Sequence, residues 1–534
     1  MQSKLLRGTF ILTLGSLISK ILGLLYVIPF YHIVGDEGQA LYAYAYVPYT
    51  IFLSLATTGI PAAVAKYIAK YNALEEYAVG RKLFKSGILV MSLTGVVAFT
   101  SLYYLAPLLA NASSSDLNVD STIQVIRAVS YALLLVPIMS IVRGFFQGHQ
   151  SMGPFAISQV VEQIVRIVFL LVGAFVVIQL LDGTITEAVS VATFAAFIGA
   201  IGGLLVLIYF WKKRKPQFDQ LLQKDKKTLD ISLRDMYKEI IIYAAPFVFV
   251  GLNNSLFQLV DQFTVNNTLL SIGYTQEEVT TAYAVLSMQT HKLVIIPVTL
   301  AVAFSTTLIP VITDAFTKED KTKLHTQLNQ TFQVVLFLTL PAAIGISLLA
   351  EPIFTLFYEY KEIGSLVLRV YAPVALLFAF FLVTSSIIQG INQQRFTVIS
   401  LIIGLVTKII LNPILLKTFG ITGAVYATAI GYTAAIGINL FVIGKYAKYS
   451  FKLSMKRGLL IIILNGIMLL FTGVVYQLLT LFLSTQKKLD SMIIIILTAI
   501  IGVFVYASLS FKSKLIYILF GNKVRRVLQK LRIL

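Results

Sequence analysis

Six charged residues fall near the middle of long apolar stretches, and their types suggest what the chain can bind. They are Lys20, Glu162, Arg166, Asp261, Lys292 and Lys408. A charge near the centre of a bilayer costs about 2.5–3.5 kcal/mol on insertion scales, so such residues usually face a polar interior. Four of the six are cations. Cations gathered inside a membrane cavity suit an anionic group such as a phosphate, so these residues predict anion binding.

Local pairing can neutralise only some of these charges. Glu162 and Arg166 are four residues apart on one predicted helix, so they can pair with each other, and this pairing weighs evenly against a direct role in ligand binding. Lys20, Lys292 and Lys408 have no acidic residue three or four positions away. Each lysine must find an anion elsewhere, bond to backbone carbonyls or lose its proton.

The elements that carry these charges are predicted membrane spans. Of 534 residues, 57% are hydrophobic and only 13% are charged, whereas ordinary soluble domains carry about 25% charged residues. We therefore expect an all-α polytopic membrane protein. A spanning helix needs about 20 mostly apolar residues, and this rule gives fourteen candidate spans: 9–33, 41–65, 86–110, 123–143, 155–181, 187–211, 240–266, 281–310, 328–350, 364–388, 397–416, 420–443, 458–483 and 491–511.

The lysine and arginine residues predict how these spans are oriented. One set of alternate loops, together with both termini, holds 33 of the 43 basic residues, and the opposite loops hold four. Basic loops stay in the cytoplasm, so both termini are expected there. The net charge of +19 then reports topology and predicts no nucleic-acid partner. The basic tail after Lys512 is expected to lie against anionic membrane lipids, with a lipid-dependent or partner-dependent switch as the alternative.

Several kinds of chemistry have no support in the sequence. The chain has no cysteine, and its four histidines (residues 32, 149, 291 and 325) lack the spacing of metal ligands, so no metal site is expected. The loops are short and hold no soluble catalytic domain. We expect no catalytic residue and no enzyme, and an integral-membrane glycosyltransferase is disfavoured because the loops offer no carboxylate cluster that could hold a metal.

Tyrosines open the second predicted span, at Tyr42, Tyr44, Tyr46 and Tyr49. Tyrosine is enriched where a span meets the membrane surface. We therefore expect an interfacial belt here, with a platform for stacking sugars as the less favoured alternative.

The chain also repeats itself. Gln147-Gly148, Ser158 and Arg166 recur 242 residues later as Gln389-Gly390, Ser400 and Lys408, and Thr57 to Pro61 resembles Thr306 to Pro310 at an offset of 249. Two similar offsets predict a duplicated half with a small insertion, each copy carrying a cation in the middle of a helix.

Three motifs and the order of the spans carry a family likeness. They are Ser19-Lys20-Ile21-Leu22-Gly23, the segment from Arg143 to Gln150, and the segment from Val161 to Arg166. With them the chain resembles the YtgP branch of the MurJ-like lipid II flippases, within the multidrug/oligosaccharidyl-lipid/polysaccharide exporter superfamily. The likeness covers essentially the whole chain, and the stretch from Arg143 to Arg166 is its most specific part.

This resemblance implies an architecture. Two pseudo-symmetric six-helix lobes, residues 1–215 and 240–446, would surround a central cavity and be joined by a basic cytoplasmic linker, 216–239. Residues 447–534 would add two helices, which in this family line a groove for a lipid tail, and a basic cytoplasmic tail.

The resemblance also implies which cations bind the substrate. The family's cations in helices one and eight fall on Lys20 and Lys292, so these two are expected to hold a diphosphate. The Gram-negative members carry a further Arg-Asp pair in helix one, where this chain has Tyr26 and Val27. They also carry an arginine in helix two, where the stretch 49–59 has no charge. Part of the phosphate-binding set is thus missing or moved, with Arg166 and Lys408 as the second-rank candidates. Glu162, Asp261 and Arg143 are candidates for the cavity or for ion pairs.

The function that the resemblance implies is transport. We expect a flippase of the bacterial plasma membrane that moves undecaprenyl-diphosphate-linked peptidoglycan precursor (lipid II) from the inner to the outer leaflet by alternating access, for cell-wall synthesis. No cofactor is expected, although the membrane potential, H⁺ or Na⁺ could drive the cycle, with Asp261 as the candidate ion site. We expect a monomer, with the cell-wall synthesis machinery as a candidate partner.

Three alternatives remain open. A flippase for another lipid-linked polysaccharide or teichoic-type unit would use the same cavity charges. A cation-coupled multidrug antiporter would favour acidic cavity residues and is less favoured. A purely structural scaffold would leave the three intramembrane lysines unexplained.

Overall fold

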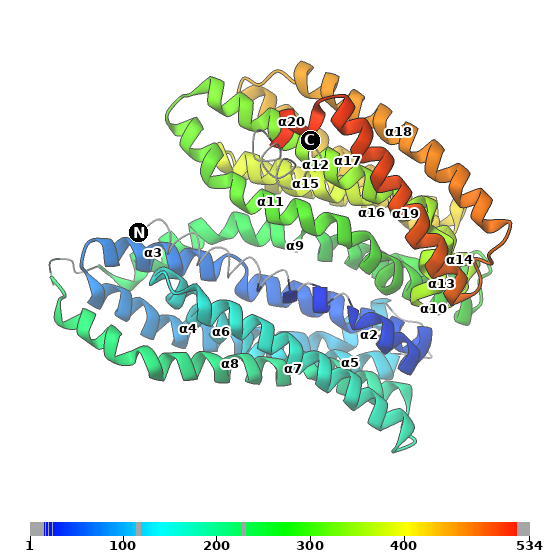
Figure 1. Ribbon diagram of the computed structural model, residues 1–534. Coiled ribbons are helices and arrows are strands. Elements are labelled where there is room, and N and C mark those ends of the chain that lie inside the picture. Colours follow the sequence, from blue (N-terminus) through cyan, green and yellow to red (C-terminus); the bar gives the residue numbers. More distant parts are fainter. Residues whose placement is uncertain are drawn as a thin grey trace. The chain divides into compact units, whose positions relative to one another are not determined.

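The computed structural model describes residues 15, 18–19, 21–23, 25–113, 119–226, 228 and 231–520, apart from the side chains at positions 242, 243, 246, 300–310 and 520. Throughout these residues the chain is built from helices and short connections, without a β-strand (Figure 1). Eleven helices in the described part are long and apolar enough to cross a membrane. The prediction of an all-α polytopic membrane protein is confirmed.

The chain divides into two compact units, residues 1–284 and 285–534. Unit 1 contains α2 (Val27–Thr57), α3 (Ile60–Ala73), α4 (Tyr77–Ser113), α5 (Val119–Ser130), the 3-10 turn η2 (Tyr131–Leu134), α6 (Val136–Gly148), α7 (Met152–Gln179), α8 (Ile185–Gln223), α9 (Leu233–Ser271) and α10 (Gln276–Ala284). Because α9 packs against α2, α3 and α4, this unit extends beyond the 1–215 lobe that the resemblance implies.

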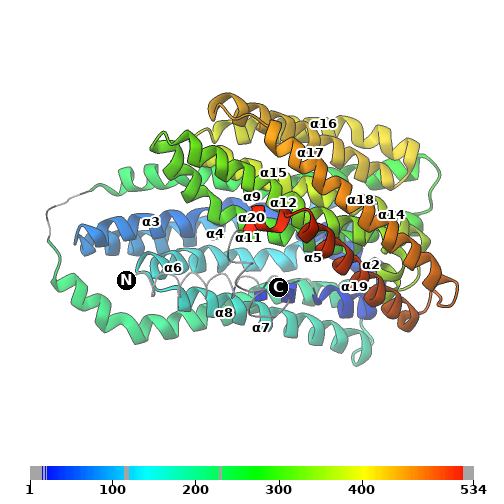
Figure 2. The same cartoon turned by 45° about the horizontal axis from the view of Figure 1, so that its top comes forward.

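Unit 2 begins with one π-helical turn, η3 (Val285–Thr290). It continues with α11 (His291–Thr317), α12 (Lys321–Leu348), α13 (Ala350–Phe357), α14 (Glu362–Tyr371), α15 (Val374–Gly390), α16 (Arg395–Phe419), α17 (Thr422–Tyr446), α18 (Lys452–Thr480), α19 (Lys488–Lys512) and α20 (Leu515–Phe520). The pair α18 and α19 runs side by side in Figure 1 and Figure 2, and α18 packs against α12.

One of the two repeated segments has a similar backbone in both copies. Gly148 ends α6 and Gly390 ends α15, 242 positions apart. Two residues after each glycine comes a left-handed residue, Gln150 with φ 55° and Asn392 with φ 57°. Such φ values are uncommon outside glycine, although five further non-glycine residues of the described chain also have them. The two turns therefore agree in the place of their left-handed residue.

The second repeated segment differs between its copies. In the first copy α2 ends at Thr57, Thr58 is extended, and Gly59 adopts φ 79° before α3 begins. In the second copy the backbone of α11 stays helical through residues 306–310. Glycine adopts positive φ at little cost, whereas Leu308 stands at the position equivalent to Gly59. This exchange explains why the helix is interrupted in one copy and continuous in the other.

The linker between α8 and α9 is fastened to the turn between α3 and α4. The buried Glu76 carboxylate accepts hydrogen bonds from the backbone N–H of Thr228, at 2.8 Å, and from its hydroxyl. Lys226 Nζ lies 2.8 Å from the carboxylate of the exposed Glu75. Asp225 accepts from the backbone N–H of Ala78 at 2.8 Å. The start of the linker is therefore anchored within unit 1.

Candidate functional site

Helix α7 carries Glu162 and Arg166 on a stretch pressed against α8. The two helices run side by side in Figure 1 and Figure 2, and glycines of α8 make their close approach possible. A Cβ added at Gly199 would lie 2.8 Å from both the Arg166 Cβ and the Glu162 carbonyl oxygen, and one at Gly203 would lie 3.2 Å from the Glu162 Cβ. Small residues four apart allow helix backbones to pack closely in membranes, so Glu162 and Arg166 are held along one face of α7.

The partner of Glu162 is Arg143, in the second half of α6. Arg143 Nη2 lies 2.7 Å from Glu162 Oε2, and Arg143 Nε donates to the Ser158 hydroxyl at 2.9 Å. Only 12% of the Arg143 side chain and 21% of the Glu162 side chain are exposed. The alternative in which Glu162 neutralises Arg166 is therefore wrong for this structure. Sequence spacing favoured the pair on one helix, but α6 brings a second arginine to the same carboxylate.

Arg166 is left as a cation with donors to spare. Its Nη1 donates to the Tyr46 hydroxyl at 3.5 Å, the long limit of a hydrogen bond, and its Nε is buried without a hydrogen-bond partner. Among the residues that the structure describes, no carboxylate pairs with Arg166. A half-buried guanidinium in this state can accept an anion without first breaking an ion pair.

Tyrosines surround this guanidinium. The ring centroid of Tyr26 lies 5.9 Å from Arg166 Cζ, and the phenols of Tyr42, Tyr46 and Tyr49 also interact electrostatically with Arg166. The Tyr26 hydroxyl donates to Tyr42 Oη at 3.1 Å, and the rings of Tyr42 and Tyr46 stack with centroids 5.2 Å apart. Sequence reasoning missed this cluster, although the spacing of Tyr42, Tyr46 and Tyr49 by four and three residues places them on one helical face.

The expectation of an interfacial tyrosine belt is wrong, because Tyr42, Tyr44 and Tyr49 are all buried. Tyr44 shows the reason. Its hydroxyl donates to Asn266 Oδ1 at 2.9 Å, and its ring stacks on that of Tyr283 with centroids 4.3 Å apart. The hydroxyls of Tyr42 and Tyr44 have hydrogen-bond partners inside unit 1, so they need no water at a membrane surface.

In unit 2, Lys408 and Lys292 lie around a buried histidine. Lys408 is fully buried, and its Nζ donates to the Thr428 hydroxyl at 2.8 Å. His291 Nδ1 lies 2.9 Å from Tyr371 Oη, and both lysines interact electrostatically with this imidazole. Lys292, the second residue of α11, is half-buried. The π-helical turn η3 comes just before these residues, and such turns are frequent at functional sites.

The remaining predicted site residues lie in unit 1. Lys20 is outside the described residues, but Gly15 and Gly23 flank it. A Cβ added at Gly15 would lie 2.8 Å from the Ala156 Cβ, and one at Gly23 would lie 2.9 Å from Gln163 Nε2. The two described glycines of the first span therefore lie close to α7. Asp261 is buried in α9.

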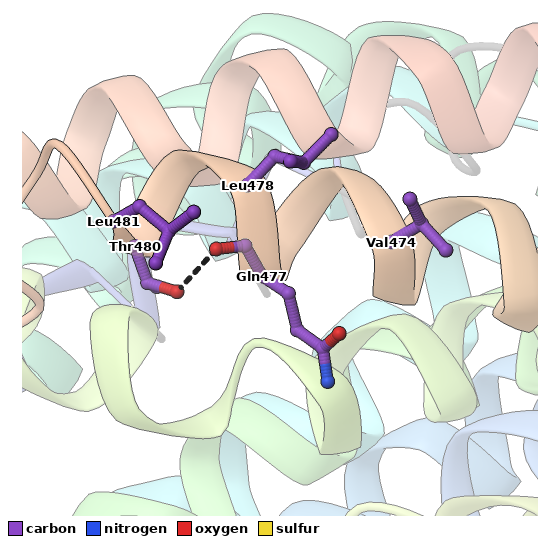
Figure 3. A pocket seen from close by; sticks show the side chains of 5 residues that line it. All are labelled: Val474, Gln477, Leu478, Thr480 and Leu481. Carbon is purple, nitrogen blue, oxygen red and sulfur yellow. Dashed lines mark hydrogen bonds between the residues drawn. The ribbon is translucent and has the colours of Figure 1, made fainter.

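A shallow, mostly apolar groove lies at one end of α18 (Figure 3). Its lining residues are Val474, Gln477, Leu478, Thr480 and Leu481. The Thr480 hydroxyl donates to the Gln477 carbonyl at 2.9 Å, and the apolar side chains are exposed. Helix α18 is the thirteenth predicted span, one of the two to which the resemblance assigns a lipid tail.

Comparison with known proteins adds independent observations. The model of the family described as polysaccharide biosynthesis protein matches residues 5–316, and the MatE model matches residues 246–414. The chain is 45% identical to lipid II flippase MurJ of Bacillus subtilis (strain 168), covering 98% of both chains. It is 25% identical to stage V sporulation protein B of the same organism, covering 84% of this chain and 85% of that protein.

Two solved structures share the fold. One is a lipid II flippase MurJ in an inward closed conformation, with a TM-score of 0.67 and 19% identity over 95% of this chain and 100% of that one. The other is an inward-facing multidrug resistance MATE family transporter, with a TM-score of 0.65 and 16% identity over 80% of this chain and 95% of that one. At these identities the likeness shows the fold alone.

Proposed function

The chain belongs to the polysaccharide biosynthesis protein family, and we propose that it is a flippase that carries lipid II from the inner to the outer leaflet of the bacterial plasma membrane. The 45% identity to a lipid II flippase, over 98% of each chain, supports this cargo. It also agrees with the resemblance carried by the segment from Arg143 to Arg166. The protein would move its cargo without changing a covalent bond, so the proposal includes no catalytic residue and no cofactor.

The observation that carries the proposal is the state of Arg166. Its guanidinium has a buried Nε without a partner, and no carboxylate of the described part of the chain neutralises it. A diphosphate offers several strong acceptors to such a fork of donors. The ring beside this guanidinium is that of Tyr26, at the position where the Gram-negative members carry an arginine. Arg166 of α7 thus places a cation next to Tyr26, the position where this chain lacks the arginine of the Gram-negative members.

Each unit carries a half-buried cation, Arg166 in unit 1 and Lys292 in unit 2. Each of these cations is proposed as a contact for the diphosphate during transport, and so is Lys20. Lys408 is fully buried. It would act through its positive field near Lys292 and His291 and would not touch the substrate. The polyprenyl tail would stay in the lipid, along the groove on α18.

The driving force would come from the membrane. Alternating access exposes the headgroup to each side in turn. Outward movement of a net anion is favoured by an inside-negative potential, at about 2.3 kcal/mol per charge per 100 mV. The buried carboxyl of Asp261 is the candidate site for a coupled H⁺ or Na⁺. The protein would work as a monomer with cytoplasmic termini and deliver its cargo to the cell-wall synthesis machinery.

The test measures lipid II in the outer leaflet of cells depleted of this protein. Cells are rescued with the wild type, Lys20→Ala, Arg166→Gln or Lys292→Ala, and with Lys417→Ala as a control that removes an exposed lysine. We expect depletion to trap lipid II inside, and the wild type and the control to restore exposure. The three site variants should fail although they reach the membrane. Unchanged exposure after depletion, in a strain without a second flippase, would show that the cargo is wrong.

A further inference from the structure

We propose that Arg143 is a positioning residue that keeps Arg166 available for its anion by holding the Glu162 carboxylate away from it. This inference rests on the proposed function, because it assigns a task to the ion pair beside the proposed headgroup site. Arg143 itself need not touch the substrate.

The geometry gives Glu162 a choice between two arginines. Glu162 and Arg166 are one helical turn apart on the same face of α7, a spacing at which opposite charges on a helix normally pair. In the structure Glu162 bonds instead to Arg143, at 2.7 Å. Arg166 is therefore well spaced to pair with Glu162 on the same helix, yet Glu162 pairs with Arg143 on another helix.

Arg143 is braced for this task. Its Nε donates to the hydroxyl of Ser158, and that hydroxyl in turn donates to the Phe155 carbonyl at 2.8 Å. Its guanidinium carbon also lies 5.6 Å from the centre of the Phe155 ring. One arginine of α6 thus contacts three successive turns of α7, which fixes the guanidinium where it meets Glu162. Pre-organised donors hold a carboxylate better than mobile ones do.

The charges of the three residues explain the consequence. Arg143, Glu162 and Arg166 together carry a net charge of +1, and the ion pair places this surplus charge on Arg166. Without Arg143 the net charge is zero, and Glu162 is free to pair with Arg166. An anion would then have to displace a carboxylate from the guanidinium before it could bind.

The duplicated half supports this interpretation. At the offset of 242, Arg166 corresponds to Lys408, so the cation is kept. Arg143 corresponds to Ser385 and Glu162 to Gly404. The second copy thus lacks both the arginine and the glutamate at these positions. The two residues are present together in one copy and absent together in the other.

The test measures binding of farnesyl diphosphate to the purified full-length protein in nanodiscs, with farnesol as the control ligand that lacks the diphosphate. We expect Arg143→Gln and Arg166→Gln each to weaken binding by about tenfold or more, the loss expected when a charged hydrogen-bonding partner is withdrawn. Glu162→Gln should bind at least as tightly as the wild type. The Arg143→Gln/Glu162→Gln double variant should return to wild-type affinity, because its net charge is again +1.

A double-mutant cycle separates positioning from a purely structural role. If Arg143 acts through Arg166, Arg143→Gln causes no further loss in an Arg166→Gln background. A further loss there overturns the inference, and so does a failure of Glu162→Gln to restore binding. Should Arg143→Gln not fold, the Glu162→Gln variant and the double variant still decide the matter, because weakened binding by either contradicts the proposal.

The outcomes also separate this inference from the proposed function. If the affinity pattern holds but lipid II exposure does not depend on the protein, the positioning role stands and the cargo is wrong. If the wild type binds and the variants do not follow the pattern, only the positioning role fails. A wild type that does not distinguish farnesyl diphosphate from farnesol overturns the anion site at Arg166 and this inference with it.

Discussion

The ammonium group of Lys408 donates a 2.8 Å hydrogen bond to the hydroxyl of Thr428 on the neighbouring helix, and both residues are buried. We predict that Thr428→Val lowers stability by about 1–3 kcal/mol, because a buried charged donor loses an acceptor. Adding Lys408→Met should recover most of this loss, since apolar replacement of a buried polar pair is often nearly neutral.

Thermal unfolding of purified protein in detergent measures both effects. The control is Thr433→Val, on the same helix, whose exposed residue bonds only to the Ala429 carbonyl of its own helix. We expect this variant to stay within about 0.5 kcal/mol of the wild type. Equal losses for the two threonine variants would show that Lys408 does not depend on Thr428.

Gly199 and Gly437 should respond in opposite ways to the same substitution. A Cβ at Gly199 would lie 2.8 Å from α7 atoms, including a backbone carbonyl oxygen, whereas a Cβ at Gly437 meets nothing within 4 Å. Gly199→Ala should therefore cost about 1–3 kcal/mol by overpacking and should also weaken farnesyl diphosphate binding by displacing Arg166. Gly437→Ala should stabilise its helix by about 0.5–1 kcal/mol. Unfolding curves of the two variants test this contrast, and a stabilised Gly199→Ala protein would contradict it.

His149 should make stability depend on pH. Burial lowers the pKa of His149 below its ordinary value of 6.5, and the positive charge of Arg81 lowers it further, while the bond to the Phe145 carbonyl opposes both. The unfolded chain therefore takes up the proton first. Stability due to the neutral imidazole is complete above about pH 6.5 and is lost as the pH falls below it, by at most about 1.4 kcal/mol per pH unit.

Melting temperatures between pH 5 and 8, for the wild type and His149→Phe, measure this effect. The ring of His149 lies 4.3 Å from that of Phe145 and 4.8 Å from that of Phe218, so an aromatic replacement keeps the packing. The wild type should lose stability relative to the variant on acidification. Parallel profiles would rule out His149 as the titrating group.

Glu76 should protect the linker from proteolysis. Its buried carboxylate accepts two hydrogen bonds from Thr228, whereas Glu75 forms an exposed pair with Lys226. We expect Glu76→Gln to increase trypsin cleavage after Lys224 and Lys226 several-fold. Glu75→Gln is the matched control and should change the rate little, because exposed ion pairs contribute only about 0–1 kcal/mol. Similar cleavage rates for both variants would mean that Glu76 does not anchor the linker.

The sequence predicts well which residues form each membrane span. It predicts poorly which face of a span lies against which neighbouring helix. The spans expected at 155–181 and 397–416 correspond to α7 and α16, with ends within three residues, because apolar length decides where a helix can cross. The partner of Glu162 could not be found in this way. Arg143 comes from a different helix, and only the packing of α6 on α7 brings the two together.

The tyrosines and Lys408 show the same limit. Their residue type predicted a membrane surface for Tyr42, Tyr44 and Tyr49, yet all three are buried. Tyr44, for example, contacts Asn266 and Tyr283, which are distant in sequence. Likewise, the residues next to Lys408 and Lys292 in the sequence do not predict that Lys408 is fully buried whereas Lys292 is half-buried. Which side of a helix is buried depends on the neighbouring helices. In a span that is apolar on every side, hydrophobic periodicity cannot indicate the buried side.

The difference between Gly59 and Leu308 affects where each copy can bend. Helix α11 is continuous over 27 residues, about 40 Å, and Pro297 inside it has no backbone N–H, so α11 can kink there without being divided. Its counterpart is instead divided into two helices at Thr58 and Gly59. A bend in the first copy therefore changes the angle between two helices, whereas a bend in the second copy deforms one helix.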